Sequence, residues 1–240
     1  MFQIEQARKE LEDLLEILIE KTNFNQYLTG QVSFDTWRAR TNKSLPDEIR
    51  ASNGMSRFVF WRCGNPFCVF KMVMDDDIDY NANEAFIYQR AVEAGLEHWF
   101  ARTEKIKSII YGNHQTDFYA MEFCIPGEDE LEEMSWDLCK KEYCEDEGLD
   151  PDKLTAEQES DLAGWIDDDD LCGSDGMEHL MRSLYADEDV GRFYDFLEEN
   201  YVNDTHCGNW GLHDNRWVLI DYAGYGHDIK AKVEWDKQYA

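Results

Sequence analysis

Three features are scarce in this chain. No apolar run approaches the ~20 residues that cross a bilayer, so no membrane-spanning helix is expected. The first residues carry Glu5, Glu10 and Glu12 instead of the basic and apolar blocks of a signal peptide, which predicts a cytoplasmic protein. Positive charge is also scarce. With 23 Lys and Arg against 52 Asp and Glu, the net charge of −29 argues against direct binding to nucleic acid or to a membrane surface.

Cysteine is present in an odd number, seven, which is too few for a dense disulfide framework in 240 residues. Reduced thiols are therefore expected. Two pairs share one spacing, Cys63/Cys68 and Cys139/Cys144, which is compatible with a four-thiolate zinc site. The favoured alternative is structural, because the first pair flanks a turn and the second fits small buried positions of a helix.

The chain has the composition of a folded protein, with 43% hydrophobic and 14% aromatic residues, and its length allows one large core or two lobes. Its acidity is unevenly distributed, because residues 127–204 contain 28 Asp and Glu but only 5 Lys and Arg. A segment of this kind attracts basic proteins. A solvated helical surface explains it equally simply and is the favoured interpretation.

The residues near the end have the spacing of a phosphotransfer centre. Asp204 and Asn209 stand five apart, and Asp221 ends an apolar run. In such a centre Asp204 is the base that accepts the proton of the incoming hydroxyl. Asn209 and Asp221 are the ligands of Mg²⁺, the amide adding no charge. Residues 210–212 and 216–220 are expected to form a hairpin that brings these groups together.

The stretch Asp204-Thr-His206-Cys-Gly208-Asn209 resembles the catalytic loop of the protein-kinase-like superfamily, in the version found in aminoglycoside, choline and lipopolysaccharide kinases and in small phage protein kinases. The resemblance implies ATP and Mg²⁺ as cofactors. It also implies an α+β, two-lobed protein-kinase-like fold with a five-stranded antiparallel small lobe and a minimal, mostly helical large lobe. The corresponding divisions are an N-terminal amphipathic helix with its connector (1–46), the small lobe (47–124) and an acidic large lobe (125–240).

Apolar spacing predicts an amphipathic helix over residues 3–22, packed on the small lobe or used in a dimer contact. Residues 23–46 are expected to be a connector, held to the core by Phe24, Tyr27, Phe34 and Trp37. Strands follow within 48–74, and two more at 105–111 and 117–124. The acidic segment 128–200 is expected to be helical, with helices from Leu131 to Cys144, from Thr155 to Trp165 and from Asp189 to Tyr201.

Lys71 is an isolated cation in an apolar strand, and the resemblance assigns it to the α- and β-phosphates of ATP. The alternative is a charged residue that protects an edge strand. A helix over 82–94 is predicted to end at Gly95, with Asn81 or Asn83 as its cap. Glu84, expected in its first turn, would pair with Lys71 or simply complement the helix dipole.

The segment from Met121 to Gly127 resembles a kinase hinge, with Met121 as gatekeeper and the Glu122 to Cys124 backbone facing the adenine. Of the family's Gly-rich loop only Gly54 remains. Other departures are Val202 in place of the usual His, the metal-binding turn Asp221-Tyr-Ala-Gly224, and only nineteen residues after Asp221. A minimal large lobe of this kind resembles the compact kinases of lytic phages, which would place the protein in the host cytoplasm.

The sequence supports three functions. The first is a Ser/Thr protein kinase that acts on host proteins during phage takeover. The second is a catalytically weak, kinase-like acidic protein that binds and inhibits a basic or nucleic-acid-binding host protein, with nucleic-acid mimicry as one way of doing so. A small-molecule kinase is the third, because His206 and Gly208 match that branch, although those enzymes have a longer large lobe. The four residues Lys71, Asp204, Asn209 and Asp221 together favour the first.

Overall fold

The chain forms a mixed α+β structure, as expected from the sequence. The computed structural model describes residues 3–41, 45–53, 57–64, 66–74, 79–166 and 171–223. These divide into two compact units, one ending at Cys124 and the other beginning at Ile125. Within the described ranges, no helix combines the length and apolar character needed to cross a membrane.

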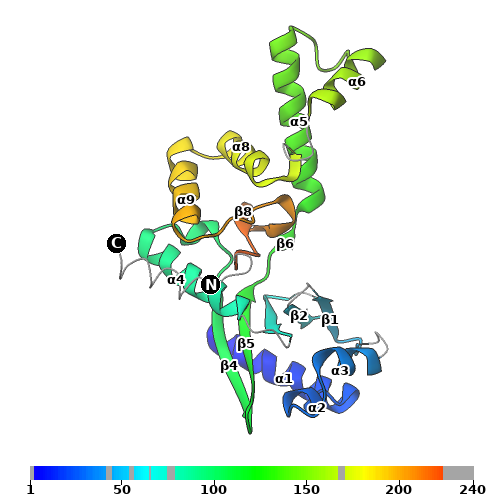
Figure 1. Ribbon diagram of the computed structural model, residues 1–240, viewed down its shortest axis with the longest axis vertical. Helices are drawn as coiled ribbons and strands as arrows, with labels where there is room; N and C mark the ends of the chain where they lie inside the picture. Colours follow the sequence, from blue (N-terminus) through cyan, green and yellow to red (C-terminus); the bar gives the residue numbers. More distant parts are fainter. Residues whose placement is uncertain are drawn as a thin grey trace. The chain divides into compact units, whose positions relative to one another are not determined.

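The first unit contains, in its described part, the predicted five-stranded antiparallel sheet, with strand order β1-β2-β3-β5-β4. Figure 1 shows the long hairpin of β4 and β5 and, further along the sheet, β2 and β1. β3 is therefore the central strand, and all but its last residue are buried. β4 and β5 form a long hairpin with a bulge at Ile106, which is buried. The strand bounds are β1 (Ile49–Asn53), β2 (Arg57–Arg62), β3 (Cys68–Val73), β4 (Thr103–Tyr111) and β5 (His114–Glu122).

Helix α1 (Ile4–Thr22) buries its apolar stripe in the core of this unit, together with the aromatic residues of β2, β3 and β5. The helix was expected to pack on the part of the chain that contains the five strands, and it does so. The stretch 23–46 was expected to be a connector, but it contains two short helices, α2 (Asn25–Leu28) and α3 (Phe34–Arg40). Its four predicted anchors are buried as expected, with exposed fractions of 0 to 2%: Phe24, Tyr27, Phe34 and Trp37.

Helix α4 (Tyr80–Ala94) connects β3 to the 3₁₀ turn η1 (Glu97–Trp99) and β4. It ends at Gly95, which has a left-handed φ of 70°, as predicted. The predicted cap is wrong. Asp79 caps the helix by accepting a hydrogen bond from the amide of Ala82 at 3.0 Å, whereas Asn81 and Asn83 are buried inside the helix. Because the helix begins at Tyr80, Glu84 lies beyond its first turn.

The second unit combines helices with a small sheet of order β6-β7-β8 in its described part. The predicted helices are present, and α6 begins with a capping box between Thr155 and Gln158. The apolar spacing before Asp204 predicts that five residues share the inner side of the last helix, and helix α9 buries four of them, Val190, Phe193, Phe196 and Leu197. The fifth, Tyr201, lies beyond the end of the helix and is half-buried, so the prediction is wrong there. The bounds are α5 (Glu128–Glu147), α6 (Ala156–Trp165), α8 (Ser174–Leu184), α9 (Asp187–Glu199), η2 (Cys207–Asn209), β6 (Ile125–Pro126), β7 (Trp210–His213) and β8 (Arg216–Leu219).

The hairpin β7–β8 was predicted with its turn at the right place. Asp214 and Asn215 both have left-handed φ angles, 47° and 61°, as a two-residue type I′ turn requires. β6 pairs with β7, so the segment after Cys124 is held against the hairpin. Gly127 permits close packing there, because a Cβ atom at this position would lie 2.1 Å from Cζ3 of Trp217.

Candidate functional site

Lys71 lies on β3, in the middle of the sheet, with only 4% of its surface exposed. β2 pairs with β3 on one side and β5 on the other, so an edge-protecting role for Lys71 is wrong. A buried ammonium group requires a partner of opposite charge. That partner is Glu84.

Glu84 is completely buried and accepts hydrogen bonds from the Lys71 ammonium through both carboxylate oxygens, at 3.0 Å to Oε1 and 2.8 Å to Oε2. The predicted contact between these two residues is confirmed. Arg57 on β2 also donates to Glu84 Oε1, from Nη1 at 2.6 Å. Sequence reasoning missed Arg57, because a polar residue at the start of a strand carries no signal of a partner 27 residues away.

The start of α4 is fixed to the sheet by a second contact. The hydroxyl of Tyr119 donates to Oδ2 of the capping residue Asp79 at 2.8 Å. Tyr119 is the register partner of Lys71 across β3 and β5, so the contacts that these two residues make with Asp79 and Glu84 arise from neighbouring positions of the sheet. Burial and the neighbouring Asp79 carboxylate raise the pKa of Tyr119 above its ordinary value. Lys71 and Arg57 therefore hold the Glu84 carboxylate, and Tyr119 holds the residue that caps the same helix.

The segment predicted as a hinge, Met121 to Gly127, begins with the last two residues of β5 and includes β6. Met121 is buried, as a gatekeeper side chain would be, and the amide of Glu122 donates to the carbonyl of Arg102 at 3.0 Å. Within the described chain, the backbone amide of Cys124 has no hydrogen-bond partner. Burial raises the pKa of the Cys124 thiol to about 12, so the thiol is protonated and unreactive at neutral pH. Gly54, the remaining residue of the predicted Gly-rich loop, lies outside the described residues, as does Gly224.

In the second unit, backbone contacts bring Asn209 and Asp221 together. The carbonyl of Asn209 accepts hydrogen bonds from the amides of Ile220 at 2.8 Å and of Asp221 at 3.4 Å. The Asn209 side chain donates from Nδ2 to the carbonyl of Asp204 at 2.8 Å. The three residues that the sequence selected are therefore linked through Asn209.

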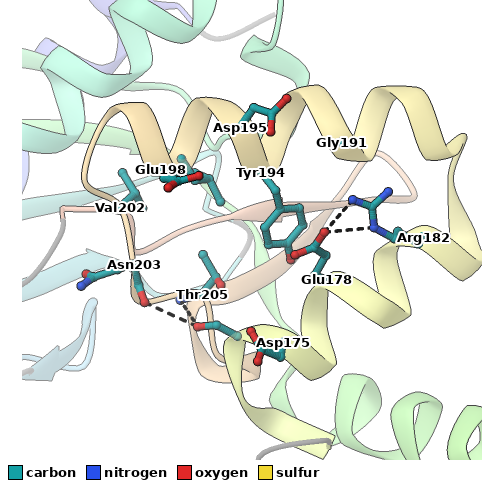
Figure 2. A pocket seen from close by; sticks show the side chains of 12 residues that line it. Asp175, Glu178, Arg182, Gly191, Tyr194, Asp195, Glu198, Val202, Asn203 and Thr205 are labelled. Atoms are coloured by element: carbon teal, nitrogen blue, oxygen red, sulfur yellow. Dashed lines mark hydrogen bonds and ion pairs between the residues drawn. The ribbon is translucent and has the colours of Figure 1, made fainter.

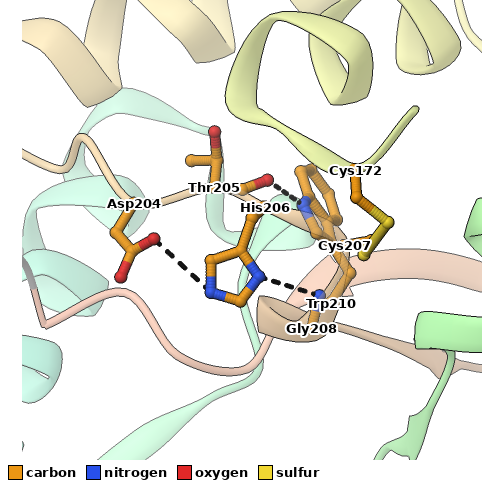
Figure 3. The surroundings of a disulfide bond; sticks show 7 residues. All are labelled: Cys172, Asp204, Thr205, His206, Cys207, Gly208 and Trp210. Carbon is orange, nitrogen blue, oxygen red and sulfur yellow. Dashed lines mark hydrogen bonds and ion pairs between the residues drawn. A yellow bond between two sulfur atoms is a disulfide. The ribbon is translucent and has the colours of Figure 1, made fainter. Parts of the chain in front are cut away.

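His206 lies between Asp204 and Gly208 (Figure 3). Its Nδ1 accepts a hydrogen bond from the Gly208 amide at 3.1 Å, so the ring proton is on Nε2, which lies 3.5 Å from Oδ1 of Asp204. The carboxylate of Asp204 is about half exposed, with a side-chain exposure of 50%. Gly208 is required for this arrangement, because a Cβ atom there would lie 2.9 Å from Cε1 of His206.

Cys207 in the same loop forms a disulfide with Cys172, with a Cα–Cα distance of 5.0 Å (Figure 3). The expectation of reduced thiols throughout is thus wrong. The two cysteines are 35 residues apart in sequence, with α8 and α9 between them. Their pairing depends on how these helices pack, so the sequence alone does not indicate it. The pairs considered for zinc belong to different units, Cys63 and Cys68 to the first, Cys139 and Cys144 to the second.

The residues at the loop fit Mg²⁺. Among the described residues, no cluster of three or more His, Cys, Asp or Glu side chains is arranged to hold a metal ion. A Mg²⁺ ion bound to a nucleotide needs fewer protein ligands, because phosphate oxygens and water complete the coordination that one or two carboxylates begin. The amide oxygen of Asn209 and the carboxylate of Asp221, on residues joined by backbone hydrogen bonds, are oxygen donors of this kind.

No protein-family model matches the chain, and no characterised protein matches it in sequence. The functional interpretation therefore depends on the residues themselves. The predicted site residues form two groups, each within one unit. The first contains Lys71, Glu84, Met121, Glu122 and Cys124, and the second contains Asp204, Asn209 and Asp221.

A cavity of about 400 Å³ adjoins the loop, between α8, α9 and residues 202–205 (Figure 2). Four carboxylates of the acidic segment line it, Asp175, Glu178, Asp195 and Glu198. Arg182 is the cation among the lining residues, and it donates to Glu178 from Nε at 3.0 Å and from Nη2 at 2.6 Å. The cavity therefore favours a cationic group over an anionic one.

Proposed function

We propose that the protein is an ATP- and Mg²⁺-dependent phosphotransferase with a two-lobed, protein-kinase-like architecture, which phosphorylates Ser or Thr residues of host proteins as compact phage kinases do. The observation that carries the proposal is the buried contact between Lys71 and Glu84. In kinases the corresponding pair joins the third strand to the following helix and positions the lysine on the ATP phosphates. The strand order and the place of α4 between β3 and β4 support the same proposal.

In this proposal the first unit holds the nucleotide. Lys71, oriented by both oxygens of Glu84, donates to the α- and β-phosphate oxygens. The backbone amide of Cys124 donates to the adenine ring, and the buried side chain of Met121 borders it. Arg57 donates to the same carboxylate oxygen, Oε1, that accepts a hydrogen bond from Lys71, and adds a second contact that positions Glu84. Nucleotide binding would thus depend on residues already held in place by the fold.

The second unit carries the chemistry. Asp204 accepts the proton of the substrate hydroxyl while the hydroxyl oxygen forms its bond to the γ-phosphorus of ATP, and ADP leaves. The Nε2–H of His206 faces the Asp204 carboxylate and orients it. Asn209 and Asp221 would hold Mg²⁺ through their side-chain oxygens, and the ion would supply positive charge to the phosphate oxygens. The half-exposed position of Asp204 suits a carboxylate that must meet a protein side chain.

Thermal unfolding with ATP and Mg²⁺ tests nucleotide binding. A ligand at a hundred times its Kd stabilises the folded state by about 2.7 kcal/mol, so the parent protein should unfold at a higher temperature, and chelation of Mg²⁺ should remove the shift. Lys71→Met should abolish it. Lys141→Met, at a side chain that is 68% exposed, is the matched control and should keep it. The same unfolding temperature for the parent with and without millimolar MgATP would refute the proposal.

A second candidate function is supported by the acidic cavity. In this alternative the protein is an acidic binder that occupies a basic surface of a host protein, with weak or no catalysis. The combined change Asp195→Asn and Glu198→Gln should then weaken binding to a Lys- and Arg-rich peptide, and added salt should do the same. The control is Asp161→Asn with Glu157→Gln, two exposed acids on α6. Binding that survives Asp221→Asn and requires the cavity acids would favour the binder.

A further inference from the structure

The first residue of α8 and a cysteine just before this helix contact the loop that contains Asp204. The hydroxyl of Ser174, the first residue of α8, makes two hydrogen bonds: it accepts from the Thr205 amide at 3.3 Å and donates to the Asn203 carbonyl at 3.5 Å. Two residues earlier, Cys172 is bonded to Cys207 (Figure 3). The loop is therefore attached to one segment at both sides of Asp204.

The disulfide joins the loop at Cys207, in the middle of the hydrogen bonds that fix its shape. Cys207 is 2% exposed and stands between His206 and Gly208, which form the hydrogen bond that sets the histidine ring. The next residue, Asn209, donates to the Asp204 carbonyl and accepts from the amides of Ile220 and Asp221. A change in the position of Cys207 therefore acts on the base and on the metal ligands together.

We propose that Cys172 and Cys207 form a reversible thiol–disulfide pair that fixes loop 203–209 when oxidised and releases it when reduced. Disulfides inside cells are commonly of this reversible kind, whereas structural ones belong to oxidising compartments. The other cysteines are poor candidates for such a role: of the five outside the pair, four are buried and only Cys63 is exposed. The effect on phosphotransfer rests on the proposed function; the effect on the loop does not.

The reaction is a thiol–disulfide exchange with a small thiol such as glutathione. A glutathione thiolate attacks Sγ of Cys172, which is more exposed than Cys207, and the bond between the two cysteines breaks. Cys207 leaves as a thiolate and takes up a proton. A second glutathione thiolate then attacks the mixed disulfide, which releases the Cys172 thiol and glutathione disulfide. Two glutathione molecules supply the two electrons, and glutathione disulfide reverses the reaction.

Alkylation of the folded protein tests the pair directly. After equilibration with glutathione disulfide, an alkylating reagent should label Cys63 and leave Cys172 and Cys207 unlabelled. After equilibration with reduced glutathione, Cys172 should be labelled as well, and intact mass should show the gain of two hydrogens before labelling. Labelling of Cys172 to the same extent in both buffers would overturn the proposal.

Hydrogen exchange tests the effect on the loop without requiring any activity. Reduction should speed exchange of the Gly208 and Asn209 amides by about tenfold or more, while the β7–β8 hairpin beyond the loop changes little, because the loop loses one attachment. Cys172→Ser should show the fast exchange in both buffers, and Cys63→Ser should respond as the parent does. Equal loop exchange of the oxidised and reduced parent would overturn the proposal.

Phosphotransfer in the same two buffers separates this inference from the proposed function. Displacement of a catalytic group by about 1 Å lowers a rate on the order of 10²-fold, so the reduced parent and Cys172→Ser should be at least about tenfold slower than the oxidised parent. If neither form transfers phosphate but loop exchange still follows the redox state, the proposed function is wrong and the thiol–disulfide pair stands. If an active enzyme transfers phosphate at the same rate in both redox states, the Cys172–Cys207 pair does not control the site.

Discussion

Lys71 and Glu84 are joined through both oxygens of one carboxylate, at 3.0 and 2.8 Å, with no exposed surface on the glutamate. Removing the charge of Glu84 leaves the Lys71 ammonium buried beside a neutral amide, and breaking a buried ion pair in this way costs about 3–5 kcal/mol. Glu84→Gln should therefore lower the free energy of unfolding by about that amount and weaken MgATP binding. Denaturant unfolding measures the first quantity.

Glu93→Gln is the matched control for that experiment, because it is the same change at an exposed position of the same helix. It should change the unfolding free energy by less than about 0.5 kcal/mol. Equal stabilities of the Glu84→Gln and Glu93→Gln variants would contradict a buried ion pair at Lys71.

Tyr119→Phe removes the hydrogen bond to Asp79 and leaves the ring in place. A hydrogen bond to a charged group contributes about 1.5–3 kcal/mol, so the unfolding free energy should fall within that range. Tyr111→Phe, at a side chain that is 61% exposed, should have no measurable effect. If Tyr119→Phe is as stable as the parent, the hydroxyl does not hold the start of α4 to the sheet.

Stability should fall at alkaline pH. Burial raises the pKa of Tyr119 and of Tyr194 above the ordinary value of about 10, so above that pH the unfolded chain loses tyrosine protons that the folded protein retains. The stabilising contribution is fully present below pH ~10 and is lost as the pH rises toward the folded-state values. Urea unfolding at a series of pH values from 8 to 11 measures the slope, which should be smaller in Tyr119→Phe. A flat or rising profile above pH ~10 would contradict the prediction.

Gly208→Ala should displace the ring of His206, because the new Cβ atom would lie 2.9 Å from Cε1. Overpacking of this kind costs about 1–3 kcal/mol, and the histidine loses its position next to Asp204. Gly164→Ala is the control, since no atom lies within 4 Å of its Cβ position and alanine favours the helix by about 0.5–1 kcal/mol. Gly208→Ala should therefore lower the free energy of unfolding and Gly164→Ala should raise it. A change in the same direction for both variants would argue against crowding at Gly208.

Much of the fold was predictable because it is encoded in local patterns. The apolar stripe of α1, the alternation in the strands and the Asp214-Asn215 turn depend on residues close in sequence. The pairing of Lys71 with Glu84 was predictable only through the kinase resemblance, which supplied the relation between a strand and a helix.

The features that were missed depend on contacts between distant residues or on competition between neighbours. Arg57, the Ser174 contacts and the Cys172–Cys207 disulfide join positions 27 to 35 residues apart, which no periodicity records. The cap of α4 was misplaced because three polar residues within five positions are all good caps. Asp79 has an additional contact, because its second oxygen accepts a hydrogen bond from Tyr119 on β5, a residue 40 positions away in sequence.

Transfer of labelled γ-phosphate from ATP to the proteins of a host lysate tests the central claim most directly. The parent should label Ser and Thr residues in the presence of Mg²⁺, Asp221→Asn should lower the rate by at least about 10²-fold, and Asp161→Asn, an exposed acid on α6, should leave it unchanged. Absence of labelling by the parent, or equal labelling by the parent and Asp221→Asn, would contradict the account.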